Sequence, residues 1–248
     1  MPLMRTSNPT LKENTFARTG TDASGEVMTL HGTVARTAFL LALALASGAW
    51  TWSRFATAGP AVMPWLWTGL IGGLILALAT TFVPRWAPLT APLYALCEGL
   101  LLGAISAFYE ARYGGIVLQA VGLTFGTLIC LLAAYASGLI QVTEKFKLGV
   151  VAATGAICLI YVANMILGFF GIHIPGIFGN GLVGLGFSAV VVAVAALNLV
   201  LDFDFIERGA RAGAPKYMEW YGAFALLVTL VWLYLELLRL LSKARSRD

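Results

Sequence analysis

The sequence predicts an all-α membrane protein built as a bundle of seven transmembrane helices. Of the 248 residues, 59% are hydrophobic and only 11% are charged, whereas ordinary globular domains carry about 25% charged residues. The apolar residues form runs of roughly 20, the length that a helix needs to cross the bilayer core. Strands of about ten residues with alternating polarity, as a membrane barrel needs, are absent from the pattern. The runs must be helices, because backbone polar groups cannot stay unpaired in hydrocarbon.

Seven apolar segments follow one another along the chain, separated by turn and breaker residues. Pro84 and Pro88 separate the second segment from the third, and a turn with Gly209, Gly213 and Pro215 separates the last two. The hydropathy criterion predicts spans at about residues 33–53, 64–83, 88–108, 116–140, 148–171, 181–201 and 217–241.

The first 30 residues are polar, and they lack the apolar core of a signal peptide. We interpret them as a mobile tail, with a folded or docking element as the alternative. The predicted organisation is therefore a polar amino-terminal tail over residues 1–30 and a seven-helix transmembrane domain over residues 31–248.

The lysines and arginines near the ends of the spans predict a cytoplasmic amino terminus, because cytoplasmic loops are enriched in both residue types. In that orientation the cytoplasmic side carries ten of them: Arg5, Lys12, Arg18, Arg36, Arg85, Lys145, Lys147, Arg208, Arg211 and Lys216. The opposite side carries six, four of them at the carboxy terminus: Arg54, Arg112, Arg239, Lys243, Arg245 and Arg247.

Several glycines are spaced four residues apart, a pattern that lets helix backbones approach closely in lipid. We expect these glycines to pack helices together and to carry no chemistry. The pairs are Gly69 with Gly73, Gly99 with Gly103, and Gly122 with Gly126.

Motifs of several other functional classes are missing from the sequence. It has no basic, aromatic-interleaved face for nucleic acid, and Cys97, Cys130 and Cys158 do not fit a disulfide framework or a zinc site. No HExxH-type metalloprotease motif occurs. A serine protease would need a Ser–His or Ser–Lys pair at membrane depth, and no lysine lies deep in a predicted span. We therefore expect no enzyme and no bound cofactor.

Ionisable residues inside apolar spans are costly to bury and often mark ion pathways. Glu98 lies near the middle of the third predicted span. Glu236 and Arg239 are three residues apart on the last helix, so they can pair on one face, and we interpret that pair as structural. Asn198 fits a hydrogen bond between helices.

Four acids flank the turn between the last two spans: Asp202, Asp204, Glu207 and Glu219. If the two helices form an antiparallel hairpin with its turn near residue 210.5, Asp202 and Glu219 face each other at one depth. Two carboxyl groups held close share one proton and titrate as a unit. Once deprotonated, they could bind calcium, which takes several oxygen ligands in loose geometry. The alternative is that Asp202, Asp204 and Glu207 are solvated at the interface near the basic residues of the same turn, Arg208, Arg211 and Lys216.

Four stretches occur in an order and spacing typical of one membrane-protein family. They are EGLLLGAISAFYE, GGIVLQAVGLTFGTLICLLAAY, LNLVLDFDFIE and APKYMEWYGAFALLVTLVWLYLELLRLL, and the tail segment SNPTLKENTF adds a fifth. With them the chain resembles the Bax-inhibitor family, and more closely its bacterial YccA-like branch. The resemblance implies a seven-helix fold with the last helix central, in the bacterial plasma (inner) membrane, with a cytoplasmic amino terminus.

The resemblance also implies a pH-sensitive calcium leak channel. In the family, an aspartate late in the sixth helix and one early in the seventh share a proton and gate the pore. Asp202 matches the first, and the second falls on Glu219, a longer acid, with Asp204 as the alternative partner. Arg85 is the candidate counter-ion and Glu98 a candidate contact in the ion path. Calcium would be the transported ion, with Asp202 and Glu219 as its ligands.

A second class of function stays open. Bacterial relatives are associated with the membrane-anchored protease FtsH, and a polar amino-terminal tail suits docking to such a partner. The chain would then be a modulator that binds a membrane protease or another membrane complex without transport of its own.

Overall fold

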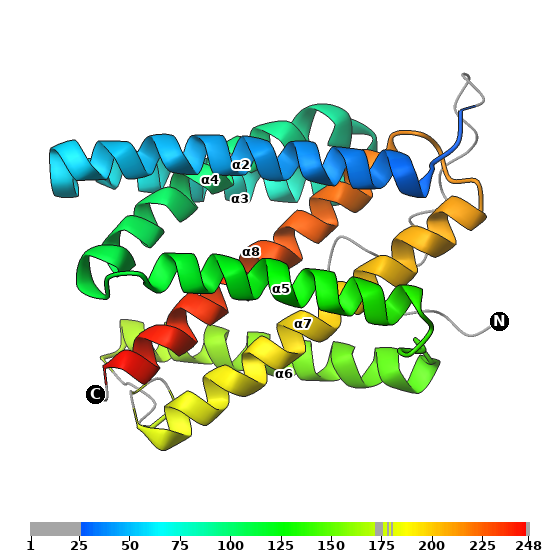
Figure 1. The fold of residues 1–248 in the computed structure, drawn as a ribbon. Helices are drawn as coiled ribbons and strands as arrows, with labels where there is room; N and C mark the ends of the chain where they lie inside the picture. Colours follow the sequence, from blue (N-terminus) through cyan, green and yellow to red (C-terminus); the bar gives the residue numbers. More distant parts are fainter. Residues whose placement is uncertain (1–25, 172–175, 178, 180, 247–248) are drawn as a thin grey trace. The chain divides into compact units, whose positions relative to one another are not determined.

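Seven long helices account for most of the chain in the computed structural model, which describes residues 26–171, 176, 177, 179 and 181–246 (Figure 1). Each of the seven is long and apolar enough to cross a membrane. The predicted all-α, seven-helix fold is therefore confirmed over the described residues. In chain order the helices are α2 (Leu30–Ala58), α3 (Met63–Phe82), α4 (Ala87–Arg112), α5 (Ile116–Ala136), α6 (Glu144–Phe169), α7 (Leu182–Arg211) and α8 (Met218–Arg245).

The helices belong to two compact units. The first, which we call the α2–α4 unit, holds α2, α3, α4, the part of α7 from Asp204 and the part of α8 up to Val228. The second, the α5–α6 unit, holds α5, α6, α7 up to Phe203 and α8 from Thr229. Helices α7 and α8 therefore contribute residues to both units.

Close backbone approaches pack the three complete helices of the α2–α4 unit. A β-carbon on Gly103 of α4 would overlap Gly48 of α2, and one on Gly99 would overlap the backbone of Ala44. On α3, a β-carbon on Gly69 would come within 2.7 Å of the Leu101 backbone nitrogen. These glycines carry out the packing role that their spacing predicts.

The third glycine pair does not follow this prediction. A β-carbon on Gly122 or Gly126 of α5 would meet no atom within 4 Å. These two glycines face outward, as the exposed Leu118 and Ile129 of the same helix do. Spacing alone did not separate the outward-facing pair from the packed ones.

Helix α8 has the largest buried share of the seven, 67% of its apolar window against 11% for α6. This is the burial expected of a central last helix. The outer helices keep large apolar side chains exposed, such as Phe82 of α3 and Phe169 of α6, as expected for surfaces that lipid covers.

Helix α7 runs ten residues beyond its predicted end at residue 201. Two ion pairs between side chains four residues apart, Asp204 with Arg208 and Glu207 with Arg211, stabilise this polar extension. The predicted turn residue Gly209 therefore lies inside the helix. The chain turns at Gly213, which has a positive φ of 67°, a conformation that glycine adopts without strain.

Replacing a packed glycine should destabilise the protein far more than replacing an outward-facing one. Gly103→Leu forces the side chain against the backbone of α2, and we expect a loss of about 3 kcal/mol in unfolding free energy. Gly126→Leu is the matched control and should change it by less than about 0.5 kcal/mol. Thermal unfolding in detergent measures both. Equal stabilities of the two variants would contradict the helix contact at Gly103.

Candidate functional site

Asp202 is buried in the α5–α6 unit, with 1% of its surface exposed. Its Oδ2 atom accepts a hydrogen bond of 2.5 Å from the hydroxyl of Thr229 on α8. Its neighbours along α7, Leu201 and Phe203, are buried as well. An acid in such apolar surroundings is costly to ionise, which makes it a candidate for binding a proton or a cation.

Asp204 and Glu207 follow the structural alternative that their sequence surroundings left open. The Asp204 carboxylate lies 2.6 Å from the guanidinium of Arg208, and Glu207 lies 2.5 Å from that of Arg211. Both partners lie one turn further along the same helix. These two acids therefore stabilise the end of α7.

Glu219 is fully buried in the α2–α4 unit and holds the start of α2 against the start of α8. Its Oε1 atom accepts hydrogen bonds of 2.9 Å from both the backbone nitrogen and the hydroxyl of Thr29. Its Oε2 atom forms an ion pair with Arg36. The ammonium of Lys216 lies 3.6 Å from Oε1. We call Glu219, Thr29, Arg36 and Lys216 the Glu219 clamp.

The first residues of α2 are suited to the clamp. Thr29 is the N-cap of the helix, and its hydroxyl also accepts from the backbone nitrogen of Gly32. The carboxyl of Glu219 lies directly beside Gly32, where a β-carbon on any other residue would overlap it. A carboxylate at this position is favoured by the positive ends of two helix dipoles, because it lies beside the amino termini of α2 and α8.

Further contacts extend the clamp along the chain. The Arg36 guanidinium lies 5.2 Å from the centre of the Trp220 ring, a cation–π geometry. The backbone nitrogen of Met28 donates a 2.6 Å hydrogen bond to the carbonyl of Ala214. The end of the predicted polar tail is thus joined to the α7–α8 turn.

The predicted pairing of Asp202 with Glu219 concerns residues of different units, and it stays a prediction. Within the α5–α6 unit Asp202 meets Thr229, a residue ten positions beyond Glu219 on α8. The counter-ions of Glu219 are Arg36 and Lys216. Sequence reasoning had a signal for Arg36, because this arginine lies inside the predicted first span, where an unpaired cation is costly.

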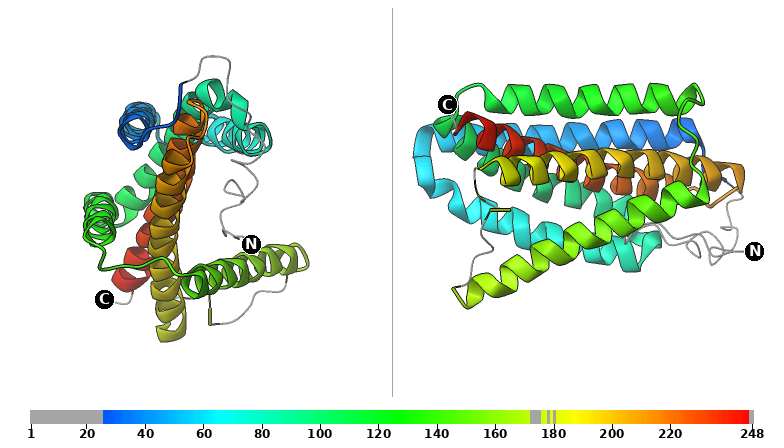
Figure 2. Two further views of the ribbon diagram at one scale, coloured as in Figure 1. Left: turned by 90° about the vertical axis from the view of Figure 1, so that its right-hand side faces the viewer. Right: turned by 90° about the horizontal axis from the view of Figure 1, so that it is seen from below.

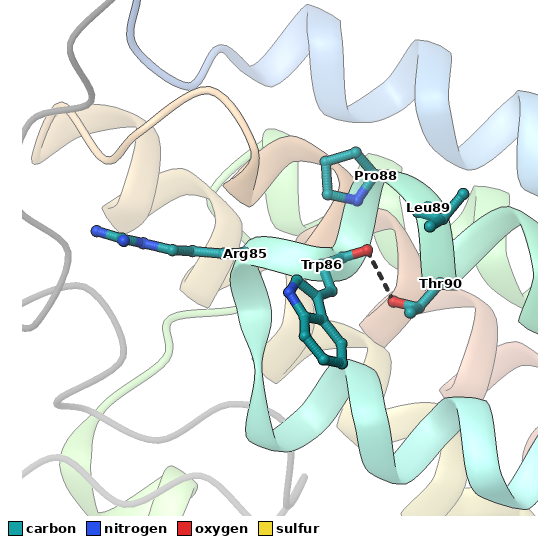
Figure 3. A pocket seen from close by; sticks show the side chains of 5 residues that line it. All are labelled: Arg85, Trp86, Pro88, Leu89 and Thr90. Atoms are coloured by element: carbon teal, nitrogen blue, oxygen red, sulfur yellow. Dashed lines mark hydrogen bonds between the residues drawn. The ribbon is translucent and has the colours of Figure 1, made fainter.

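Glu98 and Arg85, the other candidates from the sequence, lie at different places in the α2–α4 unit. Glu98 is buried on α4, hydrogen-bonded to Tyr94, and a β-carbon on Gly73 of α3 would come within 3.2 Å of its Oε2 atom. Arg85 is exposed at the turn between α3 and α4. Figure 3 shows it extending away from the other residues of a shallow pocket of about 360 Å³, lined by Arg85, Trp86, Pro88, Leu89 and Thr90.

Glu236 and Arg239 form the ion pair that their spacing predicts, with 2.8 Å between Arg239 NH1 and Glu236 Oε1. Tyr161 of α6 joins them: its hydroxyl donates to Glu236 Oε1 at 3.0 Å and accepts from Arg239 at 2.6 Å. Glu236 is 2% exposed. A buried acid of the α5–α6 unit is thus compensated by a cation and a hydroxyl.

Lys243 is buried near the end of α8, with 5% of its surface exposed. Its ammonium donates to the hydroxyl of Ser188 at 2.9 Å, the carbonyl of Gly184 at 3.0 Å and the carbonyl of Ile177 at 3.4 Å. Lys243 lies beyond residue 241, where the predicted last span ends, because α8 continues to Arg245. The expectation that no lysine lies deep in a predicted span stays a prediction. Three acceptors suit the charged ammonium, so this lysine is not arranged as a base for Ser188.

The buried polar side chains along α7 and α8 form one line, which we call the α7–α8 seam: Asp202, Thr229, Glu236, Lys243 and Ser188. Thr229, Glu236 and Lys243 are seven residues apart on α8, so they share a face and are spaced by about 10 Å. Their partners Asp202 and Ser188 are 14 residues apart on α7, as Thr229 and Lys243 are on α8. The two helix segments run in opposite directions (Figure 2). The matching intervals show a single antiparallel register through the α5–α6 unit.

Comparison with known proteins places the chain in a family. The Bax inhibitor 1 like family model matches residues 8–246. The chain therefore belongs to the Bax inhibitor 1-like family, a group of membrane proteins. No curated protein and no solved structure matches the chain. The YccA-like branch stays a prediction.

Removing the charge of Glu219 should destabilise the protein, because Arg36 would lose its counter-ion in a largely buried place. We expect Glu219→Gln to lower the unfolding free energy by about 3 kcal/mol. Glu207→Gln is the matched control: its partner Arg211 is exposed, so the loss should stay below about 1 kcal/mol. Thermal unfolding in detergent measures both losses.

A double-mutant cycle with Arg36→Met and Glu219→Gln isolates the ion pair from the other contacts of each residue. The clamp requires a coupling energy of at least about 1 kcal/mol. Additive losses, or a Glu219→Gln variant no less stable than Glu207→Gln, would show that the two side chains do not depend on each other.

Proposed function

We propose that this multi-pass membrane protein is a pH-sensitive calcium leak channel of the bacterial plasma (inner) membrane, with its amino terminus in the cytoplasm. Membership of the Bax inhibitor 1-like family supports the proposal. So does the charge distribution along the predicted spans, in which ten of the 16 lysines and arginines fall on the predicted cytoplasmic side.

The observation that carries the proposal is the α7–α8 seam. It places Asp202, Glu236 and Lys243 in line over 14 residues of α8, about 21 Å, between largely apolar helices. Buried ionisable groups in transmembrane segments mark ion and proton pathways, because their burial is costly and persists where function requires it. Hydroxyl oxygens of Thr229 and Tyr161 add neutral ligands of the kind that calcium accepts.

In the proposed mechanism Asp202 is the acid that senses protons. Its carboxyl accepts a hydrogen bond from a neutral hydroxyl, and the nearest acid along the chain, Asp204, forms an ion pair with Arg208. When Asp202 is ionised, its charge attracts calcium into the seam. A proton bound at low pH removes that charge and favours the closed state, so the flux should rise with pH.

Glu219 has a different environment, which determines what its substitution should do. Its carboxylate is neutralised by Arg36 and Lys216 and accepts two hydrogen bonds from Thr29. We therefore assign proton sensing to Asp202 and keep the shared proton between the two acids as a prediction to be tested. Glu98 stays a predicted cation contact.

The proposed gate predicts that Asp202→Asn changes transport more than Glu219→Gln. In liposomes loaded with a calcium dye, the wild type should leak faster at pH 8 than at pH 6. Asp202→Asn should lower the flux at pH 8 about tenfold, a barrier change of about 1.4 kcal/mol, and should abolish the pH dependence, because Asn carries no charge at either pH.

The comparison with Glu219→Gln separates the two forms of the gate. If the acids share a proton, both variants lose the pH dependence; if Asp202 acts alone, Glu219→Gln retains it. Glu207→Gln, whose acid pairs at the end of α7, is the control for surface charge. Unchanged flux and unchanged pH dependence in Asp202→Asn would refute the gate.

A second candidate function, modulation of a membrane protease, is favoured by the Glu219 clamp. Residues 27–36 comprise the end of the predicted polar tail and the start of α2, and the clamp joins them to α8. A partner bound to the tail would thereby act on the helix that has the largest buried share. The tail itself lies outside the described residues up to residue 25.

Deleting residues 1–25 distinguishes the two functions and leaves the clamp in place. A modulator should lose co-purification with the membrane protease FtsH, whereas a leak channel should keep its calcium flux within about twofold, a barrier change of about 0.4 kcal/mol. Retained co-purification of the deleted chain would rule out the tail as the docking element.

A further inference from the structure

Lys243 is the only lysine of the α7–α8 seam among the described residues. Its buried ammonium donates hydrogen bonds to oxygen atoms of neutral groups. The cup that holds it consists of the Ser188 hydroxyl and the carbonyls of Gly184 and Ile177. Ser188 itself is 1% exposed. No carboxylate of the described residues takes part in the cup, so the positive charge of the lysine is solvated there by dipoles.

The surrounding charges do not cancel this ammonium either. On α8 the nearest ionisable residues are Arg245, two residues further on, Arg239, one turn back, and Glu236, two turns back. Arg239 is itself paired with Glu236 and Tyr161. Among the described residues of α7 and of the loop before it, the groups that Lys243 contacts are the three neutral acceptors of the cup. The seam therefore carries a net positive charge at this end.

We propose that Lys243 is a fixed positive barrier at this end of the seam, which restricts the passage of divalent cations more strongly than that of monovalent ones. This inference rests on the proposed function as a leak channel. In the predicted orientation the barrier lies on the side away from the cytoplasm, opposite the end that holds Asp202.

Elementary electrostatics predicts how the height of the barrier depends on the charge of the ion. The energy of an ion in the field of a fixed charge is proportional to the charge of the ion. A calcium ion therefore feels twice the barrier that a potassium ion feels at the same place. Removing Lys243 should multiply the calcium flux by about the square of the factor for potassium.

The direct test is Lys243→Met, which keeps the length and apolar stem of the side chain and removes its charge. In liposomes at pH 8 we expect a calcium flux about tenfold above the wild type and a potassium flux about threefold above it. Lys243→Arg keeps the charge and should stay near the wild type. Arg245→Met removes a half-buried charge two residues away, which is hydrogen-bonded to Gln119 outside the cup, and it should change neither flux.

A second variant protects the test against a folding defect. Ser188→Asp leaves Lys243 in place and neutralises it with an adjacent carboxylate, so it should raise the calcium flux as Lys243→Met does. Elution as a single species in size-exclusion chromatography and a thermal unfolding transition show which variants are folded. If Lys243→Met is unfolded, the calcium flux of Ser188→Asp decides whether the barrier exists.

The outcomes separate this inference from the proposed function. A wild type whose flux depends on Asp202, with folded Lys243→Met or Ser188→Asp at the wild-type flux, overturns the barrier alone. An equal increase for calcium and potassium also overturns it, because loss of packing would admit both ions alike. A wild type and variants that are all as tight as empty liposomes overturn both. A tight wild type with a leaking Lys243→Met supports the barrier.

Discussion

The cost of burying charge in an apolar span is the constraint on which this structure depends. An isolated ion in a low-dielectric interior is strongly unfavourable, so each buried ionisable side chain needs partners close at hand. Glu219 has the guanidinium of Arg36, Glu236 has that of Arg239, and Lys243 has three oxygen acceptors. The partners of Glu219 and Lys243 lie on other elements, so they fix which faces of the helices meet, because one misplaced turn would leave a charge unpaired.

Much of the fold could be predicted because it depends on local properties. Apolar runs define the seven helices, and the spacing of Glu236 and Arg239 on one helix defines their ion pair. The partners of Glu219 could not be found in this way. Thr29 is 190 residues away in the chain, and no periodicity within one helix relates the two positions.

The hairpin of α7 and α8 shows why the site was harder to predict than the fold. A turn centred near residue 210.5 makes Asp202 level with Glu219, but the chain turns at Gly213, after the ion-paired extension of α7. The midpoint of residues 202 and 229, which are in contact, is 215.5. The turn assumed from the sequence is thus five residues from the centre of this contact, because hydropathy defines helix ends only loosely. The pairing of Asp202 with Glu219 stays a prediction.

The seam has charges of both signs, and this bears on the kind of transport that it could support. A passage lined by acids alone would bind calcium tightly and release it slowly, whereas conduction requires binding weak enough for the ion to leave its site. A buried cation at one end, Lys243, lowers the affinity for calcium there, while Asp202 raises it at the other end. Under the proposed function, such a gradient admits ions near the proton-sensing acid and opposes their passage at the far end, which is the behaviour of a slow leak.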